Sequence, residues 1–130
     1  MLQVTCAIIE HEGRVLITQR SESMPDPLLW EFPGGKIEPG ETEEECLVRE
    51  IKEELNLYVQ PLRHLTSVLH QTQTKTIQLI PFLCSLRGGD IQLLEHRAFN
   101  WVLPEDLRTY DWCLPDLPVV EEYLQQWHRI

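Results

Sequence analysis

The segment from residue 34 to residue 57 concentrates acidic side chains. Seven of its residues between positions 41 and 54 are glutamates, against one arginine and one lysine. On a helix of about 100° per residue, Glu50, Glu53 and Glu54 fall within one arc, where like charges repel. Grouped carboxylates are the ligands that Mg²⁺ takes in proteins, usually together with substrate phosphates. The pattern predicts a divalent-metal site, and its alternative is an ordinary solvated acidic face.

The flanking sequence predicts a loop and a helix that would hold these carboxylates. Residues 33–40 carry two prolines and three glycines, which excludes regular structure there. Thr42 starts a helix whose first turn, Glu43 to Glu45, places negative charge at the positive end of the helix dipole. Asn56 ends it, because Asn is the second choice after Gly for the left-handed terminal position. Four apolar residues of this helix fall at helical spacing and could dock on a sheet: Leu47, Val48, Ile51 and Leu55.

The remaining segments predict strands and a closing helix. Residues 2–9 and 14–20 flank the turn "HEG", which predicts a hairpin. The closing helix carries Asp116 as a cap and Pro118 in its first turn. Pro81 predicts an edge or a bulge in its strand. Three further strand-like runs cover residues 57–71, 75–86 and 98–102, with turns at "QTQT" and "RGGD". This order predicts a mixed α/β sandwich with helices on the faces of the sheet.

Composition limits the function classes. The chain has 130 residues, of which 42% are hydrophobic, and we expect a single domain over residues 1–130. Its formal charge of -10 argues against a nucleic acid polymer or an anionic membrane as partner. Neither a signal peptide nor an apolar run of about 20 residues is found, so we expect a cytoplasmic protein. Four widely spaced cysteines predict buried free thiols rather than a metal or redox pair: Cys6, Cys46, Cys84 and Cys113.

The spacing of the acidic segment resembles the Nudix box, G-x5-E-x7-R-E-U-x-E-E-x-G-U, in which U is aliphatic. Counted from Gly35, five residues lead to Glu41 and seven more lead to Arg49 and Glu50. Every position fits except the last glycine, where this chain has Asn56. Asn also adopts the left-handed conformation, so the departure leaves the expected metal ligands unchanged. The segments "WEFPGGKIEPGE", "EHRAFNWVLPEDL" and "LPDLPVVEEYL" are similar to the corresponding parts of the MutT-like branch of this family.

The resemblance implies a fold and an activity. The fold is a Nudix-type α/β/α sandwich, with a mixed β-sheet between helices. The activity is Mg²⁺-dependent hydrolysis, with Mn²⁺ able to substitute, of 8-oxo-dGTP or a related nucleoside triphosphate to the monophosphate and pyrophosphate. The alternatives are the same chemistry on CTP or dCTP, and an inactive nucleotide-binding sensor. The expected partner is this small nucleotide, and the chain would be a monomer or a homodimer.

The resemblance also assigns the residues of the box. The carbonyl of Gly34 and the carboxylates of Glu50, Glu53 and Glu54 would bind the metal. Gly35 would be structural, and Arg49 would pair with Glu41 to brace the loop against the helix. We favour Glu50 as the general base that takes a proton from water. Glu95 is its rival or an additional ligand, unless it is an ordinary surface glutamate.

Substrate recognition rests on three residues outside the box. Arg20 could clamp phosphate oxygens through its fork of donors, or be a solvated charge. Asp116 could accept from the amino group of cytosine or from guanine N1–H and N2–H, or serve only as the helix cap. Phe32 could pack on the base, as could Phe82, although aromatic residues in strand-like runs are more often core. The histidines lack partners at ligand spacing and are interpreted as surface or incidental: His11, His64, His70, His96 and His128.

Overall fold

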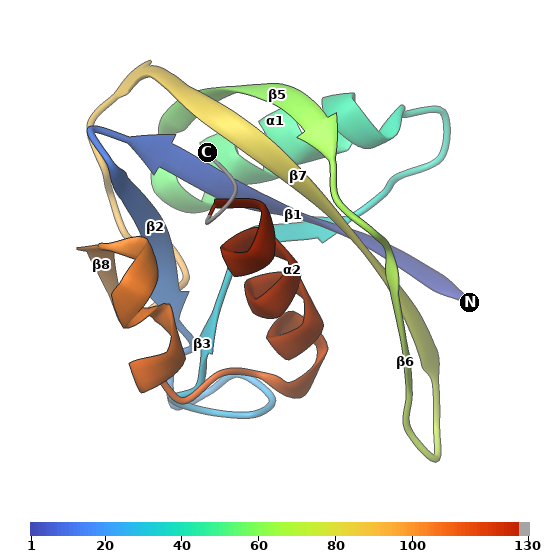
Figure 1. Ribbon diagram of the computed structural model, residues 1–130. Coiled ribbons are helices and arrows are strands. Elements are labelled where there is room, and N and C mark those ends of the chain that lie inside the picture. Colours follow the sequence, from blue (N-terminus) through green and yellow to red (C-terminus); the bar gives the residue numbers. More distant parts are fainter. Residues whose placement is uncertain (128–130) are drawn as a thin grey trace.

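The computed structural model describes residues 1–127, so the expectation for His128 lies outside the described residues. Figure 1 shows a twisted sheet with one long helix behind it and one in front of it. The elements, in chain order, are β1 (Leu2–His11), β2 (Arg14–Gln19), β3 (Trp30–Glu31), β4 (Gly34–Lys36), α1 (Glu43–Leu55), β5 (Leu57–His64), β6 (Val68–Gln71), β7 (Thr76–Gly89), β8 (Ala98–Val102), the 3-10 helices η1 (Pro104–Thr109) and η2 (Leu114–Asp116), and α2 (Leu117–Trp127).

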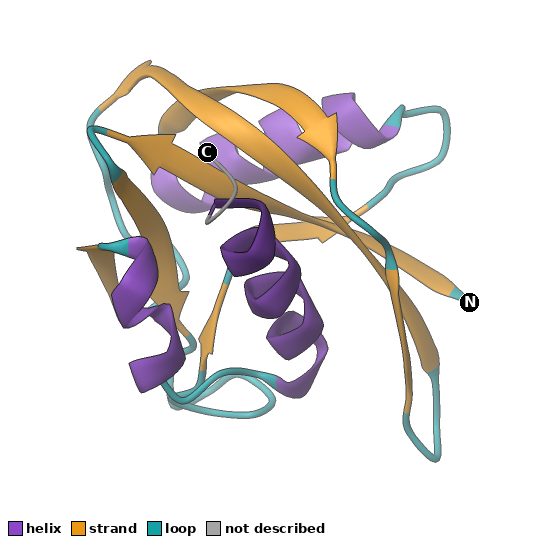
Figure 2. Cartoon of the chain, viewed as in Figure 1, coloured by secondary structure: helices purple, strands orange, loops and turns teal. Residues whose placement is uncertain are grey.

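The sheet is mixed, as predicted. Its main path runs β3-β2-β1-β7-β5, and β1 pairs with β7 in parallel from Leu2 opposite Ile77 to Glu10 opposite Ser85. The other ladders are antiparallel, and they add β4 to β1, β6 to β7 and β8 to β2. The two strands of the β6–β7 hairpin extend away from the body of the fold (Figure 2). Strand β1 is therefore the central strand, and the glycine-rich β4 lies directly beside it.

Alternation along β1 divides the core between the two faces of the sheet. Cys6 and Ile8 belong to the apolar cluster that includes α2, whereas Ala7 and Ile9 belong to the cluster that includes α1. All four are buried, because successive side chains of a strand point to opposite faces and both faces are covered here. This two-sided burial confirms the predicted α/β/α sandwich.

The ends of α1 form as the sequence predicts. The Thr42 hydroxyl accepts from the Glu45 N–H at 3.1 Å, and the Glu45 carboxylate accepts from the Thr42 N–H at 2.9 Å. This capping box satisfies two backbone donors at the start of the helix. Asn56 adopts the left-handed conformation, with φ of 57°, and its N–H bonds to the carbonyl of Lys52. The helix that carries the carboxylates therefore has fixed ends.

Several local predictions are wrong. The run 57–71 forms two strands, β5 and β6, and "RGGD" is no turn, because β7 continues to Gly89. Pro81 is not on an edge: β7 pairs with β1 on one side, and Pro81 lies where its other partner changes from β5 to β6. Its carbonyl accepts there from the Leu65 N–H at 2.9 Å. Val48, which was predicted to lie on the buried face of α1, is 36% exposed, and Cys46 is buried on that face instead.

Two expectations from composition have structural counterparts. The four cysteines are free and buried, as predicted. Over residues 1–127, no helix has both the length and the apolar character needed to cross a membrane.

Candidate active site

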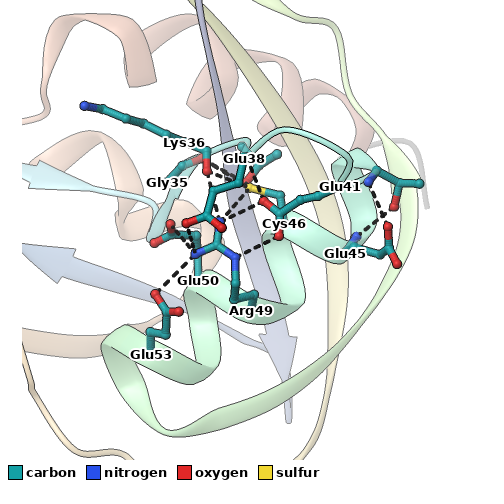
Figure 3. Close-up of polar contacts among 11 residues, drawn as sticks. Gly35, Lys36, Glu38, Glu41, Glu45, Cys46, Arg49, Glu50 and Glu53 are labelled. Carbon is teal, nitrogen blue, oxygen red and sulfur yellow. Dashed lines mark hydrogen bonds and ion pairs between the residues drawn. The ribbon is translucent and has the colours of Figure 1, made fainter.

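Arg49 lies at the centre of the polar contacts between α1 and the glycine-rich loop, residues 33–40, which includes the short strand β4 (Figure 3). Its Nε and Nη2 donate to the two carboxylate oxygens of Glu41, each at 2.8 Å, and Nη2 also donates to the carbonyl of Lys36 at 3.1 Å. Hydrogen bonding to Arg49 lowers the pKa of Glu41 to about 2. The predicted pairing of Arg49 with Glu41 is confirmed, and it ties the loop to the helix.

The same guanidinium reaches two of the expected metal ligands. Arg49 Nη1 is 3.0 Å from a Glu50 oxygen and 3.2 Å from a Glu53 oxygen. These contacts offset part of the repulsion between carboxylates on neighbouring turns. The side chain of Glu53 is 58% exposed, and Arg49 is its only neighbour of opposite charge among the described residues. Glu53 is thus the accessible member of the acidic set.

Two adjacent glycines let the loop approach the sheet and the helix. A Cβ on Gly34 would lie 2.0 Å from the carbonyl oxygen of Thr5 on β1, and a Cβ on Gly35 would lie 2.3 Å from the carboxylate carbon of Glu50. A Cβ at position 34 would meet backbone, whereas a Cβ at position 35 would require the end of the Glu50 side chain to shift. Gly34 therefore permits the β1–β4 pairing, whereas Gly35 brings backbone directly against the Glu50 carboxylate.

Cys46 is a residue of this loop contact that the sequence did not single out. Its buried thiol lies 3.3 Å from the carbonyl of Lys36 and 3.3 Å from the hydroxyl of Thr5. The Thr5 hydroxyl donates in turn to the carbonyl of Gly35 at 3.3 Å. Two small side chains, one from β1 and one from α1, thus fix the carbonyls of the loop.

Glu54 is the most perturbed carboxylate near the loop. It is 4% exposed, and its Oε2 has no hydrogen-bond partner among the described residues. Burial raises its pKa to about 10, with further contributions from the negative charges of Glu95, Glu50 and Glu31. Burial also raises the pKa of Glu50, where Arg49 opposes the shift. A buried, unpartnered carboxylate beside other carboxylates is the kind of group that a cation would stabilise.

The donor set therefore suits a hard divalent cation, but its members do not meet at one point. Within residues 1–127, no group of three or more Asp, Glu, His or Cys side chains is arranged to hold a metal ion. The predicted convergence is partial: Glu50 and Glu53 both contact Arg49 Nη1, and the charge of Glu50 contributes to the raised pKa of the buried Glu54. Oxygen ligands of these types are what Mg²⁺ takes.

A cavity of about 310 Å³ opens beside these carboxylates. Its lining includes Gly34, Gly35 and Glu54, and it also includes Phe32 and Asp116. The loop after β2 and the β6–β7 hairpin complete its walls, through residues that include Arg20, Met24, His70, Thr72 and Lys75. Most of the predicted metal and substrate residues thus share one cavity, whose lining does not include Glu50, Glu53 or Glu95.

Asp116 is a buried residue in the lining of the cavity. Its Oδ2 accepts from the backbone N–H of Phe32 at 2.9 Å, so its hydrogen bond runs to that strand end rather than to α2. Burial raises the pKa of Asp116 well above its ordinary range, and the charge of Glu31 adds to the shift. A neutral carboxyl group can donate one hydrogen bond and accept others. Phe82, in contrast, belongs to the core on the α1 face.

Arg20 is paired within the wall of the cavity. Its Nη1 donates to Glu31 Oε1 at 2.7 Å, and its Nε donates to the carbonyl of Pro25. The side chain is largely buried, so the alternative of a freely solvated charge is wrong. Glu31, which the sequence analysis did not single out, stands between Arg20 and the other carboxylates of the cavity.

His96 is the third residue near the site, after Cys46 and Glu31, that the sequence did not single out. It was expected at the surface, but it is 5% exposed and its Nε2 lies 2.8 Å from Glu31 Oε2. The two residues are 65 positions apart, so only the three-dimensional fold could reveal the pair. Together with Arg20, His96 fixes both oxygens of the Glu31 carboxylate.

Comparison with known proteins assigns the family. The family model of the NUDIX domain matches residues 1–123. The chain belongs to the Nudix family. It is 34% identical to the CTP pyrophosphohydrolase of Escherichia coli over 95% of this chain and 92% of that protein. It is 43% identical to the 8-oxo-dGTP diphosphatase of Haemophilus influenzae over 99% of this chain and 96% of that protein.

Solved structures agree with this Nudix assignment. The solution structure of the Escherichia coli ORF135 protein superposes with a TM-score of 0.89, at 32% identity, over 99% of this chain and 92% of that one. The MutT protein of Methanosarcina mazei superposes with a TM-score of 0.86, at 26% identity, over 99% and 96%. The chain thus has the Nudix fold over nearly its whole length, as its Nudix box predicts.

Proposed function

We propose that this Nudix hydrolase is a metal-dependent nucleoside triphosphate pyrophosphohydrolase, which releases the monophosphate and pyrophosphate. The observation that carries the proposal is a single cavity of about 310 Å³ whose lining includes the buried carboxylate of Glu54 together with Phe32 and Asp116. A nucleotide needs both kinds of group, since its phosphates need a cation and its base needs an apolar wall with a few polar groups. The names of the two relatives reported above, CTP pyrophosphohydrolase and 8-oxo-dGTP diphosphatase, both describe hydrolysis of a nucleoside triphosphate.

We place the cation, Mg²⁺ or Mn²⁺, at the carbonyl of Gly34 and the carboxylates of Glu50, Glu53 and Glu54. The unpartnered Oε2 of Glu54 and the raised pKa values of Glu50 and Glu54 support this placement. When bound, such a cation would offset phosphate charge and lower the pKa of water. The Gly35 backbone lies directly against the Glu50 carboxylate, and this supports a shared role for the segment and that carboxylate.

We assign the proton transfer to Glu50, with Glu95 as the rival base or an additional ligand. Glu50 is half-buried beside the loop, and its raised pKa moves it toward the pH at which a base works efficiently. Arg49 orients its carboxylate at 3.0 Å. Arg20 would clamp phosphate oxygens with the donors that Glu31 and Pro25 leave free.

For the substrate, we propose 8-oxo-dGTP or a related (d)NTP, read by Asp116 with Phe32 against the base. Burial raises the pKa of the Asp116 carboxyl well above its ordinary range and so favours its protonated form, which can donate as well as accept, as an amide does. CTP or dCTP is the second candidate, favoured by the relative named CTP pyrophosphohydrolase and by a carboxyl group facing an exocyclic amino group. The buried free thiols suit a reducing compartment, and we propose action in the cytoplasm as a monomer or homodimer.

The test is pyrophosphate release with Mg²⁺ across a panel of dNTPs, NTPs, 8-oxo-dGTP and ADP-ribose. We expect turnover of at least one nucleoside triphosphate, with kcat/KM highest for 8-oxo-dGTP or for the cytidine nucleotides. Glu53→Gln, at an exposed position, should abolish turnover while leaving the thermal unfolding midpoint in place. If the intact protein binds nucleotides but hydrolyses none of the panel, the sensor alternative replaces this proposal.

A further inference from the structure

His96 occupies a site where an apolar residue would cost less. Its side chain is fully shielded, Nε2 donates to the Glu31 carboxylate, and Nδ1 has no hydrogen-bond partner among the described residues. A buried polar atom without a partner is unfavourable, because it has lost its hydrogen bonds to water and gained none in the protein. Such a cost in a folded protein calls for a physical reason, and packing alone does not give one.

The segment around His96 carries a carboxylate of the candidate active site but little regular structure. Residues 90–97 contain no helix or strand, and Glu95 is exposed at the surface. Backbone bonds anchor the segment at intervals: Gln92 N–H to Leu55 O at 3.0 Å, Leu94 N–H to Glu54 O at 3.2 Å, and Arg97 N–H to Gln19 O at 2.9 Å. Between the last two anchors, the buried contact is that of His96 with Glu31.

This arrangement sets the distance between two carboxylates. The Leu94 contact holds the segment on the end of α1, and His96 ties it to β3 through Glu31. Glu95 lies between these two contacts, and it directly follows Leu94, whose N–H bonds to the carbonyl of Glu54 at 3.2 Å, so the backbone of residue 95 lies beside Glu54. Because consecutive residues are linked by about 3.8 Å between Cα atoms, a ring fixed at 96 leaves the backbone of residue 95 little freedom.

We propose that His96 is a positioning residue of the active site: through its hydrogen bond to Glu31 it holds the 90–97 segment so that Glu95 stays against Glu54. The inference rests on the proposed function, because Glu95 matters only if the carboxylates bind the cation or move a proton. His96 itself does not touch the substrate in this account.

Two substitutions that differ by one methylene test the contact. The amide nitrogen of Gln lies near the place of histidine Nε2, whereas that of Asn lies near Nδ1 and falls short of Glu31. We expect His96→Asn to lower kcat about 10–100-fold with KM changed less than about threefold, as for residues that orient a metal site. His96→Gln should restore kcat to within about threefold. His64→Asn is the matched control, since His64 lies 3.1 Å from Glu43 at an exposed site, and we expect no change.

A double-substitution cycle identifies the path. In a Glu95→Gln background, His96→Asn should lower kcat less than about twofold further, because its effect passes through Glu95. If the two losses multiply, or if Gln and Asn at position 96 behave alike, the proposal is overturned.

Amide hydrogen exchange gives a readout that needs no substrate. The amides of Leu94 and Arg97 should exchange at least about tenfold faster in His96→Asn, while the amide of Ala7, bonded to the carbonyl of Pro33, should not change. If the intact protein hydrolyses no nucleotide, the proposed function fails but the exchange result still stands as a test of the anchor. Unchanged exchange at both amides would overturn the anchoring role, whatever the kinetics.

Discussion

Replacing Glu54 with Gln should stabilise the metal-free protein while removing its metal response. The carboxyl group has a pKa of about 10 in the folded protein against an ordinary value of 4.5, because it is buried beside Glu95 and Glu50. The folded state therefore binds a proton that the unfolded state has lost, so stability falls as pH rises from 4.5 toward 10. At pH 7.5, three units above the ordinary value, the cost reaches at most about 4 kcal/mol at 1.36 kcal/mol per unit.

Gln keeps the shape of the side chain and cannot ionise, so it avoids this cost. At pH 5.5 the cost shrinks to about 1 kcal/mol, and the advantage of Glu54→Gln should shrink with it. The assay is urea unfolding in EDTA at the two pH values, for the unaltered protein and for Glu54→Gln. Glu53→Gln is the matched control, because Glu53 is exposed and its substitution should change the free energy of unfolding by less than about 0.5 kcal/mol.

Mg²⁺ should narrow the difference in stability between the two proteins. A ligand that binds only the folded state at 100 times its Kd adds about 2.7 kcal/mol to the unaltered protein. Glu54→Gln should gain far less, and it should lose turnover. If Glu54→Gln is less stable than the unaltered protein at pH 7.5 in EDTA, or if Mg²⁺ stabilises both equally, the account of Glu54 as a destabilised ligand is refuted.

Three further predictions follow from individual contacts. Gly34→Ala places a Cβ against the Thr5 backbone and should destabilise the fold by about 3 kcal/mol. Gly35→Ala meets only the end of the Glu50 side chain, so it should reduce turnover with little change in the unfolding midpoint. Equal thermal unfolding midpoints for the two variants would contradict this. Asp116→Asn keeps an acceptor for the Phe32 N–H and should fold normally, whereas Asp116→Ala should lose about 1–3 kcal/mol and raise KM; equal KM values for the two would contradict it. The contact of Glu41 with Arg49 should stabilise the fold above pH 4.5, and this stabilisation should be lost as pH falls toward 2. Glu41→Gln should remove this part of the pH dependence of the free energy of unfolding, which acid unfolding measures.

The helix of the active site was predictable because its signals are local, whereas the expectation of no regular structure over residues 33–40 was wrong, since Gly34–Lys36 forms β4 beside β1. Thr42 and Glu45 form a capping box within four residues, and Asn56 ends the helix through its own backbone preference. The pairing of Arg49 with Glu41 followed from the family spacing, and the structure confirms it with two bonds of 2.8 Å. The mixed sandwich followed from the order of strands and helices.

The contacts that the sequence could not reveal join residues far apart in the chain. His96 and Glu31 are 65 positions apart, and Asp116 and Phe32 are 84 apart, so no periodicity or spacing links them. The internal position of Pro81 could not be predicted for a similar reason. It depends on where the partner of β7 changes from β5 to β6, which the neighbouring strands decide and the proline does not. In each case the three-dimensional neighbour, not the residue type, decided the role.

Phosphorus-31 NMR of the reaction products is the most direct test of the central claim. The protein is incubated with 8-oxo-dGTP or CTP in Mg²⁺, and a second sample contains excess EDTA. We expect nucleoside monophosphate and pyrophosphate in the Mg²⁺ sample and intact triphosphate in the EDTA sample. The Glu53→Gln variant should give no product under either condition. Release of orthophosphate and the nucleoside diphosphate, or equal turnover in EDTA, would contradict the assignment of these carboxylates as the metal site of a pyrophosphohydrolase.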